Sequence, residues 1–546
     1  MSENNTNSIF YNKKKYFFLK FLQKKSWRYK KYIWILLSSI LLIFFIIKNR
    51  STSPTLTWKH DELKKNDTIW EIRQSQVKDA FLHSWNGYKK NGWGKDKYSP
   101  VSKTGFNNIL SGGSGWIIVD SLDTLYIMGL NKELRNARNW IASSLNFDQD
   151  EYISTFEATI RMLGGLLSAY FLTKDNLYLT KATDLSNRLL NAFNSSSGIP
   201  YSSVNLHSGD GYVYGGNGCA STAEAATLQL EFKYISFLIK SEEHWKKAEK
   251  VMRIIKDNNV KDGLVSIFIN VTDGKFRNNY ITLGSRGDSY YEYLIKQYLL
   301  TKKREKIYLK MFEEAVEGIK KHMVKYSKPS GFTFVAELPN GIDNNASFRM
   351  EHLACFLGGT LALGAKEGLN LETEEKKLIE KYKDTLKLAE ELTRTCYEMY
   401  NATVSKISPE TVYFNLDDKN DKDILIRDQD AYNLQRPETA ESLFILWRIT
   451  KNQIYREWGW SIFEAFRNHS KVEGGYTSLK NVLVDPPTLG DDMESFWLAE
   501  TLKWLYLLFS PDNVLPLDDI VFNTEAHPFP RFDLESLGFN AGWTQE

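Results

Sequence analysis

The stretch GSRGDSYYEYLIKQYLL, residues Gly284 to Leu300, decides how this sequence folds. Its second half has apolar and aromatic residues at three- and four-residue spacing, which predicts a helix. Its first half places Arg286, Asp288 and Glu292 at the start of that helix, and the two carboxylates share one face because they are four residues apart. Taken alone, the stretch has a simple structural explanation, with Asp288 as a helix cap and Glu292 as a solvated residue.

The same arrangement recurs at three other predicted helix starts. STFEATIRM, QRPETAESLF and MESFWLAET each set carboxylates beside an arginine or an aromatic residue and continue into an apolar face. The residues concerned are Glu157, Arg161, Arg436, Glu438, Glu441, Phe496 and Glu500. Each start also has a structural explanation, such as a capping box at Ser154 or Pro437 at the first helical position. If the starts converge, they form an acidic pocket with aromatic walls, which suits the hydrolysis of a glycosidic bond.

Helix-period segments follow one another along most of the chain. Several are apolar on more than one face, which predicts burial between other helices. Their repetition without a dividing linker favours one helical toroid, and a solenoid is the alternative. Residues 262–284 alternate in polarity and predict a hairpin. The predicted helices lie near 120–130, 156–172, 178–193, 221–239, 243–257, 289–300, 306–326, 348–367, 372–400, 440–450, 453–468 and 493–509.

The charge of the chain is unevenly distributed. Of its 546 residues, 25% are charged and the net charge is +3, but residues 12–31 hold many lysines and no acid. The remainder is net acidic, so a nucleic-acid surface is not indicated and no nucleic-acid partner is expected. The sequence also lacks HExxH, a CxxC pair, a phosphate-binding loop and GxSxG, and the chemistries of those motifs have no support.

The apolar run 32–47 directly follows the basic residues and carries no charge. It is shorter than the roughly 20 residues that span a bilayer comfortably, but flanking lysines and aromatic residues extend its reach. A cleaved signal peptide and a buried helix are the alternatives, and no small-residue cleavage site follows the run. We therefore expect a basic cytosolic tail at 1–31, a signal anchor at 32–47, a polar stem at 48–69 and a luminal body at 70–546.

Two further features fit a luminal body. Sequons for N-glycosylation occur at Asn66, Asn194, Asn270, Asn345, Asn401 and Asn468. The three cysteines, Cys219, Cys355 and Cys396, permit one disulfide in an oxidising compartment and leave one thiol over. The sequence alone does not choose the pair.

A family resemblance runs through these motifs from about residue 70 to residue 530. DSLDTLYIMGL, FEATIRMLGGLLSAY, SRGDSYYEYLIKQYLL, HLACFLGG, RPETAESLFILWRIT, MESFWLAETLKWLYLLF and FNTEAHPF stand in this order. They resemble the class I α1,2-mannosidases, glycoside hydrolase family 47, and most of all the fungal endoplasmic-reticulum members. The resemblance implies an all-α dominated (α/α)7 barrel with β-hairpin insertions, a bound Ca2+ ion and inversion at the anomeric carbon.

The resemblance also implies roles for individual residues. Glu157 would be the general acid, and Glu438 and Asp288 the other two essential carboxylates; which of these two is the base stays open. Thr524 would hold calcium through hydroxyl and carbonyl oxygens, with water oriented by acids completing the shell. Arg286 would reach toward the branches of the oligosaccharide, where Golgi-type relatives carry a smaller apolar residue. The residues expected to bind substrate are Arg161, Glu224, Arg286, Glu292, His352, Arg436, Glu441, Phe496, Glu500 and Glu525.

The implied function is removal of one terminal α1,2-linked mannose from the nine-mannose N-glycan of glycoproteins in the endoplasmic reticulum. The protein would be a single-pass type II membrane protein with a luminal catalytic domain and a Cys355–Cys396 disulfide. The alternative is a degradation factor of the same fold that recognises misfolded glycoproteins, either as a lectin or together with an oxidoreductase. A non-catalytic membrane scaffold is a third alternative, but it would not need carboxylates at the matched positions.

Overall fold

The computed structural model describes residues 57–213, 217–369 and 376–543. The expected cytosolic tail and signal anchor lie outside these residues. The chain divides into two units, Met1–Ile69 and Trp70–Glu546, and the account below concerns the second. Within the described ranges, no helix is both long enough and apolar enough to cross a membrane.

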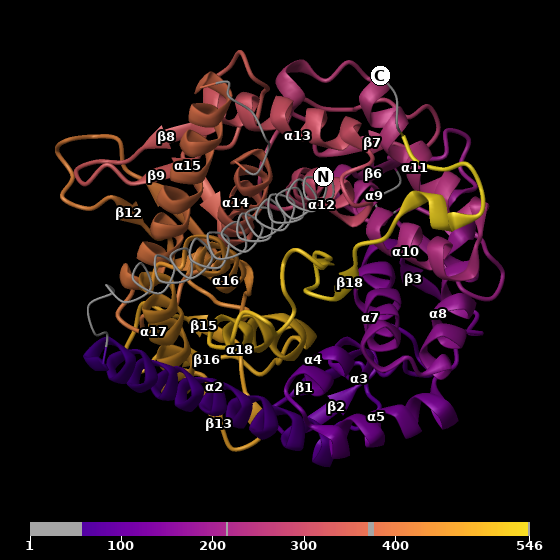
Figure 1. Cartoon of the computed structure of the whole chain (residues 1–546), viewed down its shortest axis with the longest axis horizontal. Coiled ribbons are helices and arrows are strands. Elements are labelled where there is room, and N and C mark those ends of the chain that lie inside the picture. The colour runs from indigo at the N-terminus through magenta and orange to yellow at the C-terminus, as the bar shows by residue number, and fades with distance from the viewer. Residues whose placement is uncertain (1–56, 214–216, 370–375, 544–546) are drawn as a thin grey trace, which may run out of the picture. The chain divides into compact units, whose positions relative to one another are not determined.

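Seven helical segments of the described chain form an inner ring (Figure 1). Each packs against the next along the sequence, and the last packs against the first, so the ring closes. Several of these helices are buried on all sides, as their sequences predict: every residue of α12 from Ser289 to Leu300 is buried. The segments are α3 (Trp116–Asp120) with α4 (Leu122–Ile127); α6 (Thr155–Glu157), η1 (Ala158–Leu163) and α7 (Gly164–Thr173); α9 (Thr222–Ala226) with α10 (Gln229–Ile239); α12 (Asp288–Leu300); η5 (His352–Cys355) with α14 (Phe356–Leu369); α16 (Glu438–Thr450); and η7 (Trp497–Thr501) with α18 (Leu502–Leu508).

Outer helices alternate with the inner ones along the chain and pack against them. They are amphipathic: α11 buries Trp245, Val251 and Ile255 toward the ring and presents lysines and glutamates elsewhere. Their apolar stripe therefore needs only one partner helix. These helices are α2 (Thr57–Asn91), which begins inside the expected stem, α5 (Asn131–Ser144), α8 (Asn176–Leu189), α11 (Glu242–Asp257), α13 (Lys306–Gly318), α15 (Lys376–Asn401) and α17 (Ile454–His469).

Short antiparallel strands connect the helices. The sheets are β1 (Lys97–Ser99) with β2 (Thr104–Phe106); β3 (Tyr152–Ser154), β4 (Ser203–Asn205) and β5 (Gly211–Tyr212); β6 (Cys219–Ser221) with β7 (Phe268–Asn270); β8 (Val324–Tyr326) with β9 (Thr333–Val335); β10 (Arg349–Glu351), β11 (Thr411–Phe414) and β12 (Ile424–Leu425); β13 (Lys471–Val472) with β14 (Gly475–Tyr476); and β15 (Leu479–Asn481) with β16 (Thr488–Leu489). Several of these strands, including β3, β6 and β10, lead directly into an inner helix.

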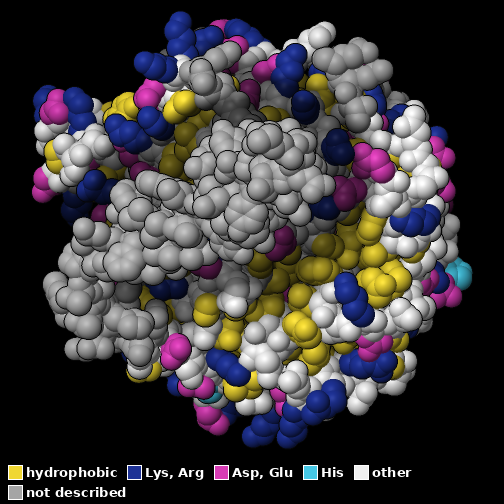
Figure 2. Space-filling view, viewed as in Figure 1, with side chains coloured by type: hydrophobic (Ala, Val, Ile, Leu, Met, Phe, Trp, Pro, Cys, Tyr) yellow, Lys and Arg dark blue, Asp and Glu magenta, His cyan; other side chains and the backbone are white. Residues whose placement is uncertain are grey.

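The last hairpin, β17 (Ile520–Phe522) and β18 (Pro528–Pro530), lies within the ring. β17 contacts α12 and β18 contacts α7, and the connecting loop contacts further inner helices through its side chains. On the face drawn in Figure 2, acidic and basic side chains are mixed around the periphery, whereas hydrophobic side chains gather toward the middle. The hairpin thus fills the bore of the ring and places its loop among the inner helices.

The expected helix-rich fold with hairpin insertions is confirmed. Each predicted helix has a helical counterpart, but 120–130 and 221–239 are each divided into two helices, and residues 324–326 and 349–351 of the helices predicted at 306–326 and 348–367 are strands. The hairpin predicted at 262–284 is present in irregular form: Ile269 and Phe276 form an antiparallel bridge, and backbone hydrogen bonds join Asn270 to Lys275 and Arg277 to Phe268. What was not predicted is that its first strand, β7, also pairs with β6. The sequence could not show this, because β6 lies about fifty residues earlier in the chain.

Candidate active site

A cavity of about 300 Å³ lies where the inner helices begin. Its walls are the first turns of η1, α9, α12, α14, α16 and η7, and the loop of the last hairpin contributes the remainder. The structure therefore brings together nearly all of the sequence-predicted site residues. Those lining the cavity are Glu157, Arg161, Glu224, Arg286, Asp288, Glu292, Arg436, Glu438, Glu441, Phe496, Glu500, Thr524 and Glu525.

Arg161 ties one wall of the cavity together. Its Nε donates to Glu157 Oε2 at 2.6 Å, and its Nη1 donates to Glu525 Oε1 on the hairpin loop. Glu157 follows the cap Ser154, whose hydroxyl accepts the Glu157 backbone N–H, so the N-cap half of the predicted capping box is present, while the Glu157 carboxylate accepts from Arg161. The Glu157 side chain remains 40% exposed, which leaves its carboxyl group accessible from the cavity. The Arg161 guanidinium also stacks on Phe496, 5.5 Å from the ring centroid.

The loop GSRGD, residues 284–288, packs closely against neighbouring backbone and thereby holds Asp288 at the cavity. A Cβ at Gly287 would lie 2.1 Å from the carbonyl oxygen of Thr282, so this position accepts only glycine. Arg286 has φ 74°, in the left-handed region, and Glu351 Oε2 accepts the backbone N–H of Ser285 at 2.7 Å. Strained backbone of this kind persists where surrounding contacts enforce it.

Burial raises the pKa of Asp288 to about 8, and the nearby carboxylates of Glu292, Glu351 and Glu438 add to the effect. Glu224 faces the same cavity, where burial and the charge of Glu157 raise its pKa. These two groups therefore favour the protonated form more than ordinary carboxyl groups do.

Glu438 has the opposite character. Burial alone would raise its pKa, but the hydrogen bond and charge of His352 and the charge of Arg436 outweigh burial and hold the pKa below its ordinary value. His352 Nδ1 lies 2.7 Å from Glu438 Oε2, and Arg436 is fixed in turn by Glu410 through a 2.7 Å hydrogen bond. Glu438 is therefore the carboxylate of the site that is held ionised.

The sequence predicted that His352 binds substrate, but His352 does not line the cavity. It is 1% exposed and lies behind Glu438, with Nε2 3.0 Å from the hydroxyl groups of both Tyr400 and Thr439. A carboxylate only accepts hydrogen bonds, so the Nδ1 atom carries the proton that points at Glu438. His352 thus acts on the site through Glu438 instead of touching the ligand.

The floor of the cavity is crowded with carboxylates. Thr524 Oγ1 donates to Glu292 Oε2 at 2.8 Å, and Lys296 bonds to the other oxygen of Glu292. Burial together with the charges of Glu292 and Glu438 raises the pKa of Glu441 to about 8. Burial and the charges of neighbouring carboxylates likewise raise the pKa values of Glu500 and Glu525 well above the ordinary range.

This donor set fits a hard cation. The oxygen atoms of Thr524 and the surrounding acids are of the type that calcium prefers, and an added positive charge would relieve the crowding of the carboxylates. Among the residues that the structure describes, no three His, Cys, Asp or Glu side chains are close enough to ligate an ion directly. Direct protein ligands would therefore come from Thr524, with water between the ion and the acids.

Behind the cavity lies a fully buried polar cluster that the sequence analysis did not identify. His527 on the hairpin loop bonds to Asp123 at 2.8 Å and to Asp120 at 3.1 Å, and Lys503 pairs with Asp123 at 2.8 Å. Asp120 also lies 3.7 Å from Arg161. The cluster fixes the hairpin loop to α3 and α4, and Asp120 also places a negative charge beside Arg161. Asp120 and Asp123 lie in the motif DSLDTLYIMGL and Lys503 in MESFWLAETLKWLYLLF, so charged residues within otherwise apolar helix patterns could have indicated the cluster.

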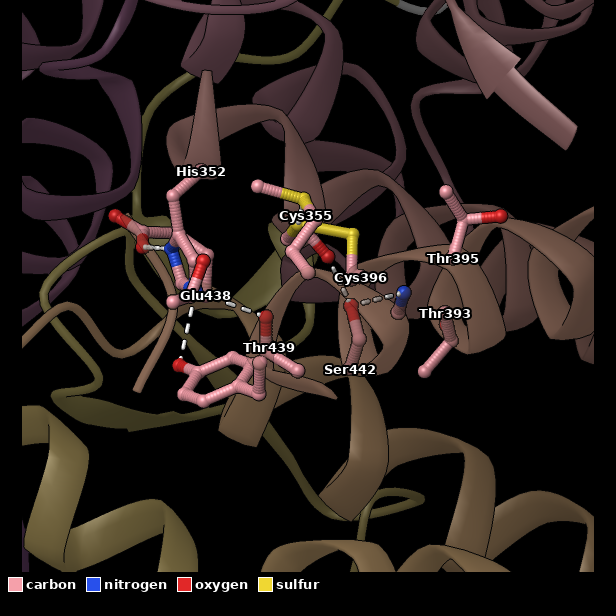
Figure 3. The surroundings of a disulfide bond; sticks show 12 residues. His352, Cys355, Thr393, Thr395, Cys396, Glu438, Thr439 and Ser442 are labelled. Carbon is pink, nitrogen blue, oxygen red and sulfur yellow. Dashed lines mark hydrogen bonds and ion pairs between the residues drawn. A yellow bond between two sulfur atoms is a disulfide. The ribbon is translucent and has the colours of Figure 1, made fainter. Parts of the chain in front are cut away.

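A disulfide joins Cys355 and Cys396, bridging η5 to the outer helix α15. Figure 3 shows it beside His352 and Glu438. Ser442, one turn beyond Glu438, donates to the carbonyl oxygen of Cys355 at 2.5 Å and accepts the Gly359 N–H at 2.8 Å. Cys219 is free and buried. The expected Cys355–Cys396 disulfide is present, and it ties η5, the turn that begins with His352, to α15.

Comparisons with known proteins agree with this geometry. Residues 80–531 match the family described as glycosyl hydrolase family 47. A mannosyl-oligosaccharide 1,2-alpha-mannosidase of Candida albicans is 51% identical over 490 residues, covering 87% of this chain and 86% of that protein. The endoplasmic reticulum mannosyl-oligosaccharide 1,2-alpha-mannosidase of Saccharomyces cerevisiae is 41% identical over 533 residues, 89% of this chain and 96% of its own length. The solved structure of an alpha-1,2-mannosidase from Trichoderma reesei matches with a TM-score of 0.76 and 27% identity, covering 85% of this chain and 99% of that one. The chain belongs to glycosyl hydrolase family 47.

Proposed function

We propose that this protein is an inverting exo-α1,2-mannosidase that removes a terminal mannose from the nine-mannose N-glycan and leaves an eight-mannose product. The names of its relatives support α1,2-mannose trimming in the endoplasmic reticulum. The observation that carries the mechanism is the contrast between two carboxyl groups in one cavity. Glu438 is held ionised by His352 and Arg436, whereas burial raises the pKa of Asp288 to about 8.

This contrast supports Glu438 as the proposed base. A general base must be ionised, so Glu438 accepts a proton from the attacking water while the water oxygen bonds to the anomeric carbon. The glycosidic C–O bond breaks, and its oxygen takes a proton from Glu157. Asp288, protonated or sharing a proton, donates a hydrogen bond to the sugar or the water. Both catalytic carboxyl groups then exchange protons with solvent, and the released mannose has inverted configuration.

The remaining residues bind and orient the sugar. Phe496 lies under the guanidinium groups of Arg161 and Arg436, each 5.5 Å from the ring centroid, and offers an apolar surface to a pyranose. Glu224, Glu292, Glu441, Glu500 and Glu525 supply acceptors for sugar hydroxyls and for water. Thr524 would hold Ca2+ through its hydroxyl and carbonyl oxygens, and the bound ion would supply a fixed positive charge for those oxygen ligands.

Arg286 is proposed to set the branch preference. Its guanidinium lies 5.1 Å from the centroid of the Phe268 ring, at the edge of the cavity, and its fork of donors suits several hydroxyls at once. We propose that it contacts the retained part of the glycan rather than the bond that breaks.

We also propose the domain order and location. A cytosolic tail at 1–31, a signal anchor at 32–47 and a stem at 48–69 would hold the catalytic (α/α)7 barrel at 70–546 in the lumen of the endoplasmic reticulum. The motivating observation is the basic and apolar pattern of the N-terminus. Protease protection of the barrel in intact microsomes, lost on adding detergent, tests this orientation.

The activity is tested by incubating the purified protein with the nine-mannose oligosaccharide. Proton NMR during the first turnovers should show β-mannose, and mass and NMR analysis should show a single eight-mannose isomer. Release of α-mannose would exclude inversion. No release of mannose would exclude the enzyme and favour a same-fold glycoprotein-recognition factor.

A further inference from the structure

A second cavity, which we call the side cavity, adjoins the active site. It is lined by Lys97, Asn108, Ile109, Trp116, Tyr152, Ile153, Ser154, Glu157, Arg161 and Glu494, and its volume is about 370 Å³. Glu157 and Arg161 line both cavities, so the two are neighbours that share one wall. None of the other side-cavity residues belongs to the site described above.

The chemistry of the side cavity suits a neutral sugar. Trp116 is 5% exposed, and its indole N–H donates to no residue in the described part of the chain. The exposed amide of Asn108 likewise has no hydrogen-bond partner among the described residues. Lys97 pairs with Glu494 at 2.7 Å, so these two charges offset one another at the cavity wall. Unpaired neutral donors beside an aromatic ring match the hydroxyls and C–H face of a pyranose.

An aromatic pair lies beside the side cavity, and one of its two members, Tyr152, lines the cavity. Tyr152 is 46% exposed and lies 6.1 Å from Tyr212, which is 49% exposed, on the neighbouring part of the same sheet. Two large aromatic side chains exposed together on the outer strands of one sheet are typical of a binding surface. Tyr152 belongs to β3, the strand that leads directly into Glu157.

Because Glu157 lines both cavities, its proposed role indicates which sugar of the glycan would lie in the side cavity. As the general acid, Glu157 contacts the oxygen between the departing mannose and the rest of the glycan, so the retained glycan leaves the active site along the Glu157 wall. The deep cavity with Asp288, Glu438 and Thr524 takes the departing mannose. The side cavity lies across Glu157 from that point.

We propose that the side cavity is an accessory subsite that binds a mannose residue of the retained glycan, with Tyr152 and Trp116 against its apolar face and Asn108 bonded to its hydroxyls. This rests on the proposed mannosidase function and deepens it. The subsite contributes affinity for a large, branched oligosaccharide and nothing to the breaking of the bond. Lys97 and Glu494 shape its floor.

The test compares two substrates, the nine-mannose oligosaccharide and α1,2-linked mannobiose. Tyr152→Ala and Asn108→Ala should each raise KM for the oligosaccharide about three- to tenfold and leave kcat within twofold, since one exposed stacking contact or hydrogen bond contributes that much affinity. Turnover of the disaccharide, which does not reach the side cavity, should change less than twofold. Both residues are exposed, so the variants should fold.

Tyr326→Ala is the matched control, because Tyr326 is 62% exposed on β8 and lines no part of either cavity. It should leave both substrates unchanged. Unchanged KM for the oligosaccharide in both test variants would overturn the subsite, and so would an equal loss on the two substrates. If the parent protein cleaves neither substrate, the proposed function fails instead, and the two failures are thereby distinguished.

Discussion

The imidazole Nδ1 of His352 lies 2.7 Å from Oε2 of Glu438, and this buried contact lowers the pKa of the carboxyl group that we assign as the base. His352→Gln should weaken the contact and let burial raise the pKa of Glu438. Because a base works only when ionised, the acid limb of kcat/KM should move to higher pH, and activity at mildly acidic pH should fall first. A pH profile of kcat/KM for parent and variant measures this.

Tyr400→Phe is a suitable control, since Tyr400 bonds to Nε2 of His352 and does not bond to the carboxylate. It should shift the acid limb less than His352→Gln does. An unchanged acid limb in a folded His352→Gln protein would show that Glu438 is not the group whose ionisation limits the rate.

Glu157→Gln preserves volume and removes the transferable proton. Turnover should fall about 10²-fold or more while the oligosaccharide still binds. Single-turnover kinetics and calorimetric titration measure the two effects separately. Loss of binding with normal turnover at saturation would contradict the assignment of Glu157 as the acid.

Removal of calcium should abolish hydrolysis and lower the melting temperature, because an ion that binds only the native state stabilises it by mass action. Thr524→Val should weaken calcium binding and reproduce both effects in part. Calorimetric scans with and without chelator, and recovery on adding Ca2+, provide the measurement. Full activity after exhaustive chelation would exclude the ion from the reaction.

Replacing Cys355 and Cys396 together with alanine opens a loop with a sequence separation of 41. Chain entropy suggests a loss of about 3–4 kcal/mol in the free energy of unfolding. Denaturant titration of the double variant checks this, with Cys219→Ser as the control that should change stability far less because Cys219 forms no disulfide. Equal destabilisation by the control would argue against a specific contribution of the disulfide.

Arg286→Leu should leave the enzyme active and broaden its products, because the preferred branch loses its donors and other branches compete on more equal terms. The product masses over time should then pass below the eight-mannose species. A variant that halts there as sharply as the parent would show that Arg286 does not set specificity, and complete inactivity would place it in the catalytic group.

Much of the fold was predictable because its signals are local. Helix caps, apolar stripes and the carboxylate at each helix start are all short-range patterns, and they located Glu157, Asp288 and Glu438. The resemblance then supplied the role of Thr524 and the cysteine pair. The place of His352 behind Glu438 was missed, because the two residues are 86 positions apart and the sequence around His352 does not show that its ring lies against that carboxylate.

Contacts between residues that are far apart in the chain could not be predicted from the sequence. β7 finds its partner in β6, and Asp120 and Asp123 find theirs in His527, about four hundred residues later. The left-handed backbone at Arg286, Gln435 and Ala526 was equally invisible, since none of these is a glycine. All three flank active-site residues, where local preference yields to the geometry that surrounding contacts impose.

The hairpin of β17 and β18 has a consequence for how the enzyme matures. It supplies Thr524 and Glu525 to a cavity whose other walls come from helices synthesised earlier, and it supplies His527 to the buried cluster behind that cavity. In a chain that is still being synthesised, Thr524 and Glu525 are added after all the inner helical segments, so the cavity lacks this part of its wall until the hairpin has been made. We therefore expect the proposed active site to be complete only after the hairpin has packed between the inner helices.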